Sequence, residues 1–382
     1  MLSTLRNIFV RVDFLLLGVA TLIVLAGMLT MNSFTGENNL FFRQLLWLII
    51  SLLVAVGASR VDWRFLRNTR FITAIYFISV FVLLLLSVIG SIFRGAQSWF
   101  DLGLFAFQPT DFAKIALILV LSKYFARRHV EIAHVRHIVV SGLYTLIIFM
   151  LVFLQPDFGG AIIIFIIWLG MVFASGISKR HIGMVFASGI LAVFVLWSFV
   201  FQDYQKARIT SFLHPLADVS GAGYNAYQST VAVGSGEIWG KGIGYGTQSK
   251  LKFLPEYETD FIFASFAEEW GFVGSLILFS LYATLIFRIL SVASQGETNF
   301  EVLYGFGVGL FFTSHFFVNI GMNIGLLPVT GITLPFMSYG GSHLLAEFLA
   351  IGILMGTSKY ARVTRKGENQ NEIIQVTSYK YR

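Results

Sequence analysis

The chain contains no cysteine and few charged residues. Without cysteine among its 382 residues it can form no disulfide framework and use no thiolate chemistry. Charged residues make up 12% of the chain and hydrophobic residues 56%, with a mean hydropathy of +0.77. This apolar content exceeds what a single soluble core of this length uses. The composition therefore predicts an integral membrane protein.

Two patterns are also missing: the alternating ten-residue segments of a membrane barrel, and any repeat of 20 to 50 residues. Apolar runs of roughly 20 residues, the length that crosses the hydrocarbon as a helix, recur instead. We expect an all-α polytopic integral membrane protein with a single domain over residues 1–382. Ten spans are expected at about 12–32, 41–59, 71–91, 108–126, 138–154, 159–176, 181–201, 263–287, 301–323 and 340–358.

The net charge of +7 follows from topology. Most Lys and Arg residues fall in the short loops on the side of both termini, including the polar tail at 359–382, so the positive-inside rule predicts cytoplasmic termini. Anionic lipid on that face accounts for the charge, and no nucleic-acid partner is needed. The first span lacks a cleavage site and is expected to be retained. The unusual residues face outward, above all in a long loop at about 202–262 that joins spans seven and eight.

The outward segment before span four carries Arg94, and the span itself begins Gln-Pro-Thr-Asp-Phe-Ala-Lys at 108–114. Pro109 suits the first turn of a helix, and an acid at Asp111 suits its N-terminus. Asp111 and Lys114 share one helix face. Two interpretations stay open: an internal ion pair that neutralises both charges, or a cationic contact for a phosphate-bearing lipid head, because ionisable residues inside a membrane often serve function.

The long loop contains Arg208 and glycine-rich turns around Lys241. Such turns can cradle phosphate through backbone N–H groups, but this spacing is not diagnostic, and taken alone it favours a plain loop. An amphipathic piece at 224–233 is expected to fold back on the membrane surface.

Acidic residues crowd the stretch 254–271, where the long loop re-enters the membrane. Asp260 is expected at the mouth, where burial can tune a proton acceptor. Glu268 and Glu269 lie just inside span eight, and a structural role, paired to a basic residue of another helix, is favoured. Farther on, the prolines, hydroxyls and paired glycines of 323–342 predict a re-entrant segment that lines a polar cavity.

These four segments, in this order, resemble the SEDS family (shape, elongation, division and sporulation) of bacterial membrane proteins, and the stretch 246–256 is more similar to its rod-shape members than to its division members. The resemblance covers the chain from the first span to the last. It implies that the acid of the family's Thr-Asp-Phe-Ile-Phe motif, here Asp260, is essential. It places the motif's proline-acid pair on Pro255 and Glu256, the basic position of span four on Lys114, and the serine of the Leu-Pro-Phe-x-Ser-Tyr-Gly-Gly-Ser segment on Ser338.

The chain departs from the family pattern at three places. Asp111 stands where the family usually has the longer glutamate, and Glu258 stands where a basic or His residue is usual. The loop reads Asp-Val-Ser-Gly at 218–221 in place of Asp-Pro-x-Gly. These departures concern local contacts.

The resemblance implies a peptidoglycan glycosyltransferase that polymerises lipid II on the outer face of the bacterial cytoplasmic membrane. It would work with the elongation machinery and a class B penicillin-binding protein as transpeptidase. Asp260 is expected to act as general base, with undecaprenyl pyrophosphate as leaving group. The negative charge of the leaving group is expected to be stabilised by Lys114, Arg208 and Lys241, with Arg94 as a weaker candidate. No carboxylate-rich or His-rich metal cage is visible, but Mg²⁺ or Mn²⁺ held by substrate phosphates and Asp260 stays open.

Two other functions compete with synthesis. A lipid II flippase would also need an outward cavity and intramembrane charges, and a third interpretation is a non-catalytic scaffold for the penicillin-binding protein. The halves of the chain show no inverted repeat, and Asp260 is expected near one surface and not at the midplane, so synthesis is favoured over transport.

Overall fold

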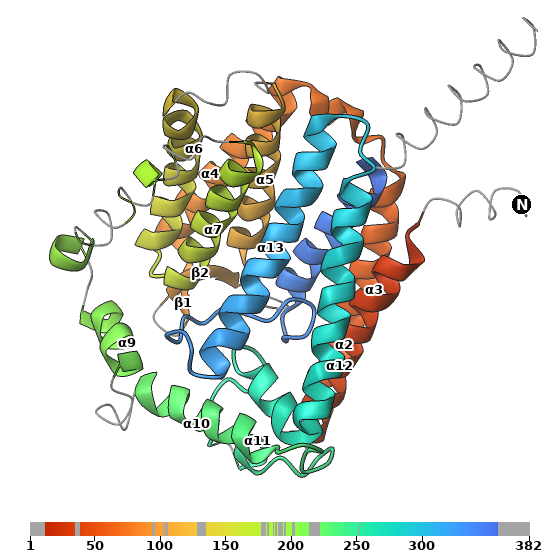
Figure 1. The fold of residues 1–382 in the computed structure, drawn as a ribbon, viewed down its shortest axis with the longest axis vertical. Coiled ribbons are helices and arrows are strands. Elements are labelled where there is room, and N and C mark those ends of the chain that lie inside the picture. Colours follow the sequence, from red (N-terminus) through yellow and green to blue (C-terminus); the bar gives the residue numbers. More distant parts are fainter. Residues whose placement is uncertain are drawn as a thin grey trace, which may run out of the picture.

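The protein is a bundle of long helices, shown in a computed structural model (Figure 1). The structure describes residues 12–34, 39–93, 96–101, 103, 106–127, 135–176, 222–251 and 253–357, together with 181–213 except 182, 186, 188, 190–193, 195 and 201–202. The long helices are α2 (Phe14–Phe34), α3 (Asn39–Arg60), α4 (Thr69–Ile89), α5 (Pro109–Ala126), α6 (Val135–Leu154), α7 (Phe158–Ala174), α12 (Ile262–Ala293), α13 (Asn299–Asn323) and the last helix, Gly341–Thr357.

Six of these helices, α2, α3, α4, α6, α12 and α13, are long and apolar enough to cross a membrane by themselves. Two more, α7 and the last helix, are apolar but shorter. The prediction of a helical multi-pass membrane protein is therefore confirmed. Of the ten expected spans, the seventh, at 181–201, is described only in pieces, such as the π-helix η2 (Leu196–Val200), so the count of ten stays a prediction.

Helix α13 runs through the middle of the bundle and packs against α5, α7 and α12. Glycines permit this close approach: a Cβ added at Gly307 would lie 2.5 Å from Ile118 of α5, and one at Gly170 of α7 would lie 2.5 Å from Leu310. Small residues at helix contacts let backbones come together where no hydrophobic driving force exists between helices. This packing sets the polar residues of α5 against those of α13.

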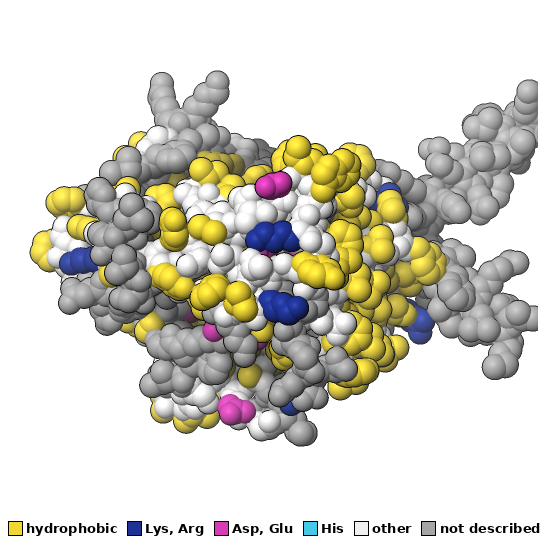
Figure 2. Space-filling model, turned by 90° about the horizontal axis from the view of Figure 1, so that it is seen from below, with side chains coloured by type: hydrophobic (Ala, Val, Ile, Leu, Met, Phe, Trp, Pro, Cys, Tyr) yellow, Lys and Arg dark blue, Asp and Glu magenta, His cyan; other side chains and the backbone are white. Residues whose placement is uncertain are grey.

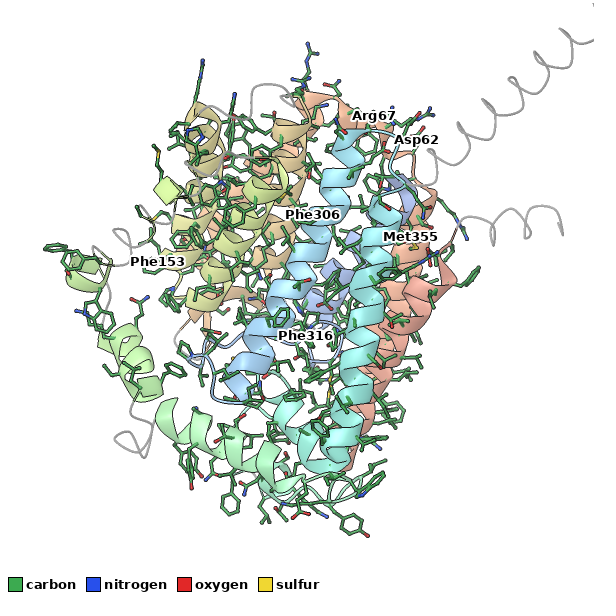
Figure 3. All side chains as sticks on the ribbon, viewed as in Figure 1. Asp62, Arg67, Phe153, Phe306, Phe316 and Met355 are labelled. Atoms are coloured by element: carbon green, nitrogen blue, oxygen red, sulfur yellow. The ribbon has the colours of Figure 1, made fainter. Side chains whose placement is uncertain are left out.

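The two ends of the bundle differ in character. At one end Arg67, in the short 3₁₀ helix η1 (Trp63–Arg67), forms ion pairs with Glu297 and Glu301 at 2.7 and 2.8 Å, and Figure 3 shows Arg67 at this end of α13. The other end, here called the loop end, carries α9 (Asp203–Leu213), α10 (Ala222–Ser235) and α11 (Thr247–Lys250). Helix α10 covers the amphipathic stretch expected at 224–233 and packs against α12 and α13.

Part of the chain before α5 is not helical. Strands β1 (Ser91–Phe93), β2 (Ala96–Asp101) and β3 (Ala106–Phe107) form an antiparallel sheet in the order β1-β2-β3. The expectation of a purely helical chain missed this small sheet. The segment is too polar and too short to span, and strand pairing satisfies its backbone N–H and C=O groups.

Span eight, expected as one continuous helix, is broken at Gly271. This residue has φ 65° and ψ −164°, which divides α12 into a half-helix at 262–270 and a long helix at 272–293. A Cβ on Gly271 would lie 2.2 Å from the amide nitrogen of Gly240, so only glycine fits here. Past the break, Phe272 N donates to Glu237 O at 2.9 Å, so the loop satisfies part of the interrupted helix ladder.

Candidate functional site

Asp260 lies in the turn that precedes the half-helix of α12. Its carbonyl oxygen accepts hydrogen bonds from Asn319 Nδ2 at 2.9 Å and from Asn323 Nδ2 at 3.1 Å, both on α13. Asn319 Nδ2 also donates to Ile332 O at 2.7 Å. Two asparagines one helical turn apart therefore fix the backbone of Asp260 against α13. Neither is among the site residues expected from the sequence, although polar residues within an expected span are a functional signal.

The turn that carries Asp260 is built on an unusual residue. Glu256 has φ 51°, a left-handed conformation that is uncommon outside glycine, and its carbonyl accepts from Phe261 N at 3.1 Å. Thr259 Oγ1 donates to Glu256 Oε2 at 3.2 Å. Burial raises the pKa of the nearby Tyr257 hydroxyl to about 12, so this group stays protonated near neutral pH. Glu256, expected as a supporting residue, lies where it closes the turn.

The irregular segment 324–340 braces the same turn. Ser338 Oγ donates to Thr259 O at 2.7 Å and accepts from Leu334 N at 2.8 Å, and Tyr339 N donates to Glu258 O at 2.8 Å. Ser338 is only 3% exposed. Ser338 is expected from the sequence to contact substrate, and in the structure its hydroxyl bonds the backbone of Thr259 and Leu334 beside Asp260.

The carboxylate of Asp260 lies beside Gly331. A Cβ built on Gly331, whose φ of +75° favours glycine, would lie 3.6 Å from Asp260 Oδ2. The half-helix starts directly after Asp260, with Phe261 at the N-cap. The Phe261 side chain makes no cap hydrogen bond, and the first-turn N–H of Ala264 donates to Asn323 Oδ1 at 3.1 Å. The positive end of a helix dipole stabilises negative charge. The turn therefore suits an ionised carboxylate or an anionic ligand.

Asp111 and Lys114 form the expected ion pair on α5, with Lys114 Nζ 2.9 Å from Asp111 Oδ1. Both side chains are buried. Lys114 Nζ also lies 3.2 Å from Nε2 of His315 on α13, and His315 Nδ1 lies 3.4 Å from Thr333 O. His315 thus links Lys114 to Thr333, two residues from Gly331, beside which the Asp260 carboxylate lies.

The pair extends to two residues of the last helix. His343 Nδ1 lies 2.9 Å from Asp111 Oδ2, and His343 Nε2 lies 2.9 Å from Glu347 Oε1 and 3.0 Å from Thr333 Oγ1. Neither residue is among the site residues expected from the sequence. The sequence does carry a signal, because a His and a Glu four residues apart share one face of an expected span.

A second buried carboxylate lies at the loop end. Glu268 is fully buried, and its Oε1 accepts from Lys241 Nζ at 2.7 Å, Thr247 N at 2.9 Å and Gln248 N at 3.2 Å. The favoured structural role of Glu268 fits this arrangement. The expected partner was wrong in one respect: the basic residue comes from the long loop and not from another helix.

Lys241 and Glu269 complete the loop contacts. Lys241 N donates to Glu268 O at 3.0 Å, and Gly244 N donates to Glu269 Oε1 at 2.6 Å. The glycine-rich turns therefore wrap around the half-helix, where their N–H groups meet its carbonyl and carboxylate oxygens. Of the loop's cations proposed from sequence for phosphate, Lys241 is neutralised by Glu268, although 30% of its side chain stays exposed.

Three expectations remain, for Arg94, Arg208 and a metal site, and the described residues cover them only in part. Arg94 lies outside them, and Arg208 belongs to α9 but its side chain is not described. Within the described part of the chain, no group of three or more His, Cys, Asp or Glu side chains is arranged to hold a metal ion.

The face at the loop end mixes apolar and charged side chains (Figure 2). Trp239 and Tyr245, in the turns between α10 and α11, are 79% and 71% exposed. Amphipathic aromatic rings of this kind favour the level of the lipid headgroups. The exposure of these rings is consistent with a loop that lies at a membrane surface.

The fold and the site define a multi-pass membrane protein with a braced acid at one end of the bundle and a buried charge network beneath it. The sequence model of the family described as "Cell cycle protein", which covers FtsW, RodA and SpoVE, matches residues 5–363. The chain belongs to this family, the SEDS family.

Named relatives agree with this assignment. The chain is 37% identical over 355 residues to the peptidoglycan glycosyltransferase MrdB of Escherichia coli (strain K12), covering 92% of this chain and 94% of MrdB. A chain of a solved peptidoglycan synthase complex, described for the coordination of polymerization and crosslinking, has a TM-score of 0.79 at 31% identity, covering 91% and 98%. The rod shape determining protein RodA of Thermus thermophilus has a TM-score of 0.67 at 29% identity, covering 91% and 96%. The similarity spans nearly the whole of each relative.

Proposed function

We propose that this chain polymerises lipid II into glycan strands, with Asp260 as general base. The activity is peptidoglycan glycosyl transfer, the activity for which its relatives are named. The observation that carries the proposal is the bracing of Asp260: its carbonyl is held by Asn319 and Asn323, and its neighbour Thr259 by Ser338. A backbone fixed in this way limits where the Asp260 carboxylate can lie, which favours pre-organisation for proton transfer.

The chemistry asks for a base because a sugar hydroxyl is a weak nucleophile. The 4-hydroxyl of the acceptor N-acetylglucosamine attacks the anomeric carbon of the growing chain and gives its proton to the Asp260 carboxylate. The bond from the anomeric carbon to the pyrophosphate oxygen breaks, and undecaprenyl pyrophosphate leaves with the electron pair. One displacement inverts the α-linked sugar to a β-1,4 linkage. Base catalysis of this kind contributes roughly 10² to 10⁴ in rate.

The departing pyrophosphate needs cationic or dipolar partners. Lys114 is the best placed, because His315 links it to Thr333, two residues from Gly331, beside which the Asp260 carboxylate lies. The N-terminus of the half-helix adds a partial positive charge at the same turn. Lys241, already paired with Glu268, has a minor role. A divalent cation, Mg²⁺ or Mn²⁺, bound through the phosphates and Asp260 would serve the same purpose.

The orientation and the partner belong to the same proposal. Both termini face the cytoplasm and the loop end faces outward, where lipid II is used, as the distribution of basic residues suggests. A class B penicillin-binding protein of the elongation machinery supplies the crosslinking activity. This is supported by the similarity to a chain of a complex described for polymerization and crosslinking.

The test is polymer formation by the purified protein from labelled lipid II, with and without the partner. Asp260→Asn should lose at least a hundredfold in rate while its unfolding temperature stays near that of the unchanged protein, because only the basicity of one carboxylate is removed. The matched control is Asp101→Asn, an exposed acid at the same end of the bundle, which should polymerise normally. Near-normal polymer from Asp260→Asn would exclude the assignment. Lipid II translocation in vesicles without polymer would instead favour a flippase, and neither activity would favour a scaffold.

A further inference from the structure

The ion pair of Asp111 and Lys114 is one part of a larger buried network. The two carboxylate oxygens of Asp111 have different partners, Lys114 Nζ on Oδ1 and His343 Nδ1 on Oδ2, each at 2.9 Å. The other ring nitrogen of His343 lies 2.9 Å from Glu347 Oε1. With both ring nitrogens protonated, His343 is a cation within ion-pair distance of both carboxylates, and its Nε2 also lies 3.0 Å from Thr333 Oγ1. Two cations then balance two carboxylates, which is what burial of such a group requires.

Glu347 connects this network to the turn that carries Asp260. Its second oxygen, Oε2, accepts from Phe336 N at 2.9 Å. The turn that contains Phe336 also contains Ser338, whose hydroxyl donates to Thr259 O at 2.7 Å. Contacts therefore run without interruption from the ammonium of Lys114, through Asp111, His343, Glu347 and this turn, to the residue that precedes Asp260.

We propose that His343, held by Glu347, is a positioning residue that fixes Lys114 relative to Asp260. His343 touches no reacting atom; it holds the Oδ2 atom of Asp111, so that Oδ1 stays directed at Lys114. In this way the distance between Lys114, the cation for the leaving group, and Asp260, the base for the acceptor, stays fixed. The inference rests on the proposed function, in which Lys114 takes up charge on the departing pyrophosphate.

The experiment is a mutant cycle on the purified full-length protein with labelled lipid II. Removing His343 alone would leave two buried carboxylates with one cation and could unfold the protein, so the main variant is the charge-balanced pair His343→Gln with Glu347→Gln. It is measured beside Lys114→Gln and the triple variant, with kcat, KM and the unfolding temperature for each. His137→Gln, a buried histidine on α6 bonded to Tyr124 Oη at 3.0 Å, is the matched control.

The pair variant should stay folded and lose roughly tenfold or more in kcat/KM, since a hydrogen bond to a charged group is of that order. That loss should disappear in the Lys114→Gln background, because His343 acts through Lys114. A purely structural role predicts additive losses instead. Normal kcat/KM in the pair variant, or additive losses, would overturn the inference.

Two further outcomes are separable. If Lys114→Gln alone keeps normal kcat/KM, the proposed contact of Lys114 with the pyrophosphate is wrong, and a loss in the pair variant would then contradict action through Lys114. If the pair variant fails to fold, Glu347→Gln alone, which keeps an oxygen for Phe336 N, takes its place in the cycle and must show the same non-additivity. His137→Gln should match the unchanged protein throughout.

Discussion

The Asp111–Lys114 pair inside the bundle and the Glu268–Lys241 pair at the loop end have nearly the same length, 2.9 and 2.7 Å. Their surroundings differ. Lys114 is 3% exposed, and its partner Asp111 also bonds an ionisable side chain of another helix. Lys241 is 30% exposed, and its partner Glu268, on the half-helix of α12, also accepts from backbone N–H groups of the long loop. A short ion pair thus says little about role. The other groups bonded to each carboxylate distinguish the two pairs. The Glu268–Lys241 pair anchors a loop, and the Asp111–Lys114 pair is proposed to orient a cation.

The largest expected effect on stability comes from breaking the loop-end pair. Glu268→Gln replaces a fully buried carboxylate that accepts from Lys241, Thr247 and Gln248, so the protein should lose about 3 kcal/mol in free energy of unfolding, as when one partner of a buried pair is removed. Thermal unfolding in detergent measures this loss. Glu237→Gln, an exposed acid of the same loop, serves as control and should change little. A small shift for Glu268→Gln would mean that the loop does not depend on this carboxylate.

The inner pair should show the opposite balance of activity and stability. Lys114→Gln should lower kcat/KM roughly tenfold or more, but cost only about 1 to 3 kcal/mol in stability, since Asp111 keeps His343 as partner. Lipid II polymerisation and thermal unfolding, measured on the same preparation, give the two numbers. Lys123→Gln, on the same helix near its other end, should polymerise normally. If Lys114→Gln unfolds the protein, the simple ion-pair interpretation is the right one.

The smallest effect is expected at the exposed member of the loop-end pair. Lys241→Gln should cost only about 1 kcal/mol, because the side chain is partly solvated and Glu268 retains the N–H groups of Thr247 and Gln248. Polymerisation should change less than for Lys114→Gln. Lys250→Gln, an exposed lysine on α11, provides the baseline. A loss in activity as large as that of Lys114→Gln would contradict the difference proposed between the two pairs. It would indicate that Lys241 contacts substrate, as expected from the sequence.

Much of the fold could be predicted from the sequence because its signals are local. The helices from α2 to α7 follow from apolar runs, and Pro109 marks the start of α5 as expected. The break at Gly271 could not be read in this way, because a glycine inside an apolar run is also a common packing residue. Its left-handed conformation depends on the approach of Gly240 from the long loop, which is a tertiary contact. The small sheet at β1 to β3 was missed for a related reason, since such short strands carry little periodic signal.

The candidate site was predicted less completely than the fold. Asp260, Asp111 and Lys114 stand in recognisable motifs, and the Asp111–Lys114 spacing of three residues fixes a shared helix face. Ser338 was recognised, but its direction was not, because a hydroxyl in an irregular segment can point either to substrate or to backbone. Asn319, His343 and Glu347 lie within apolar spans, where single polar residues appear isolated until the helices are packed together.

The sequence by itself determined that this is a helical membrane protein of the SEDS family and that Asp260 stands in its most distinctive motif. Hydropathy and motif spacing are properties of neighbours along the chain, and they survive without knowledge of packing. Only the tertiary structure decided which charges share a partner. Lys241 meets Glu268 because the loop wraps the half-helix, and Asp111 meets His343 because glycines let α5 approach α13 and Gln108 N bonds Ser342 Oγ at the start of the last helix. Such pairings join residues more than 20 positions apart, so no local sequence pattern predicts them. Away from water, the interaction between two charges is stronger, so the choice of partner has a large effect on energy.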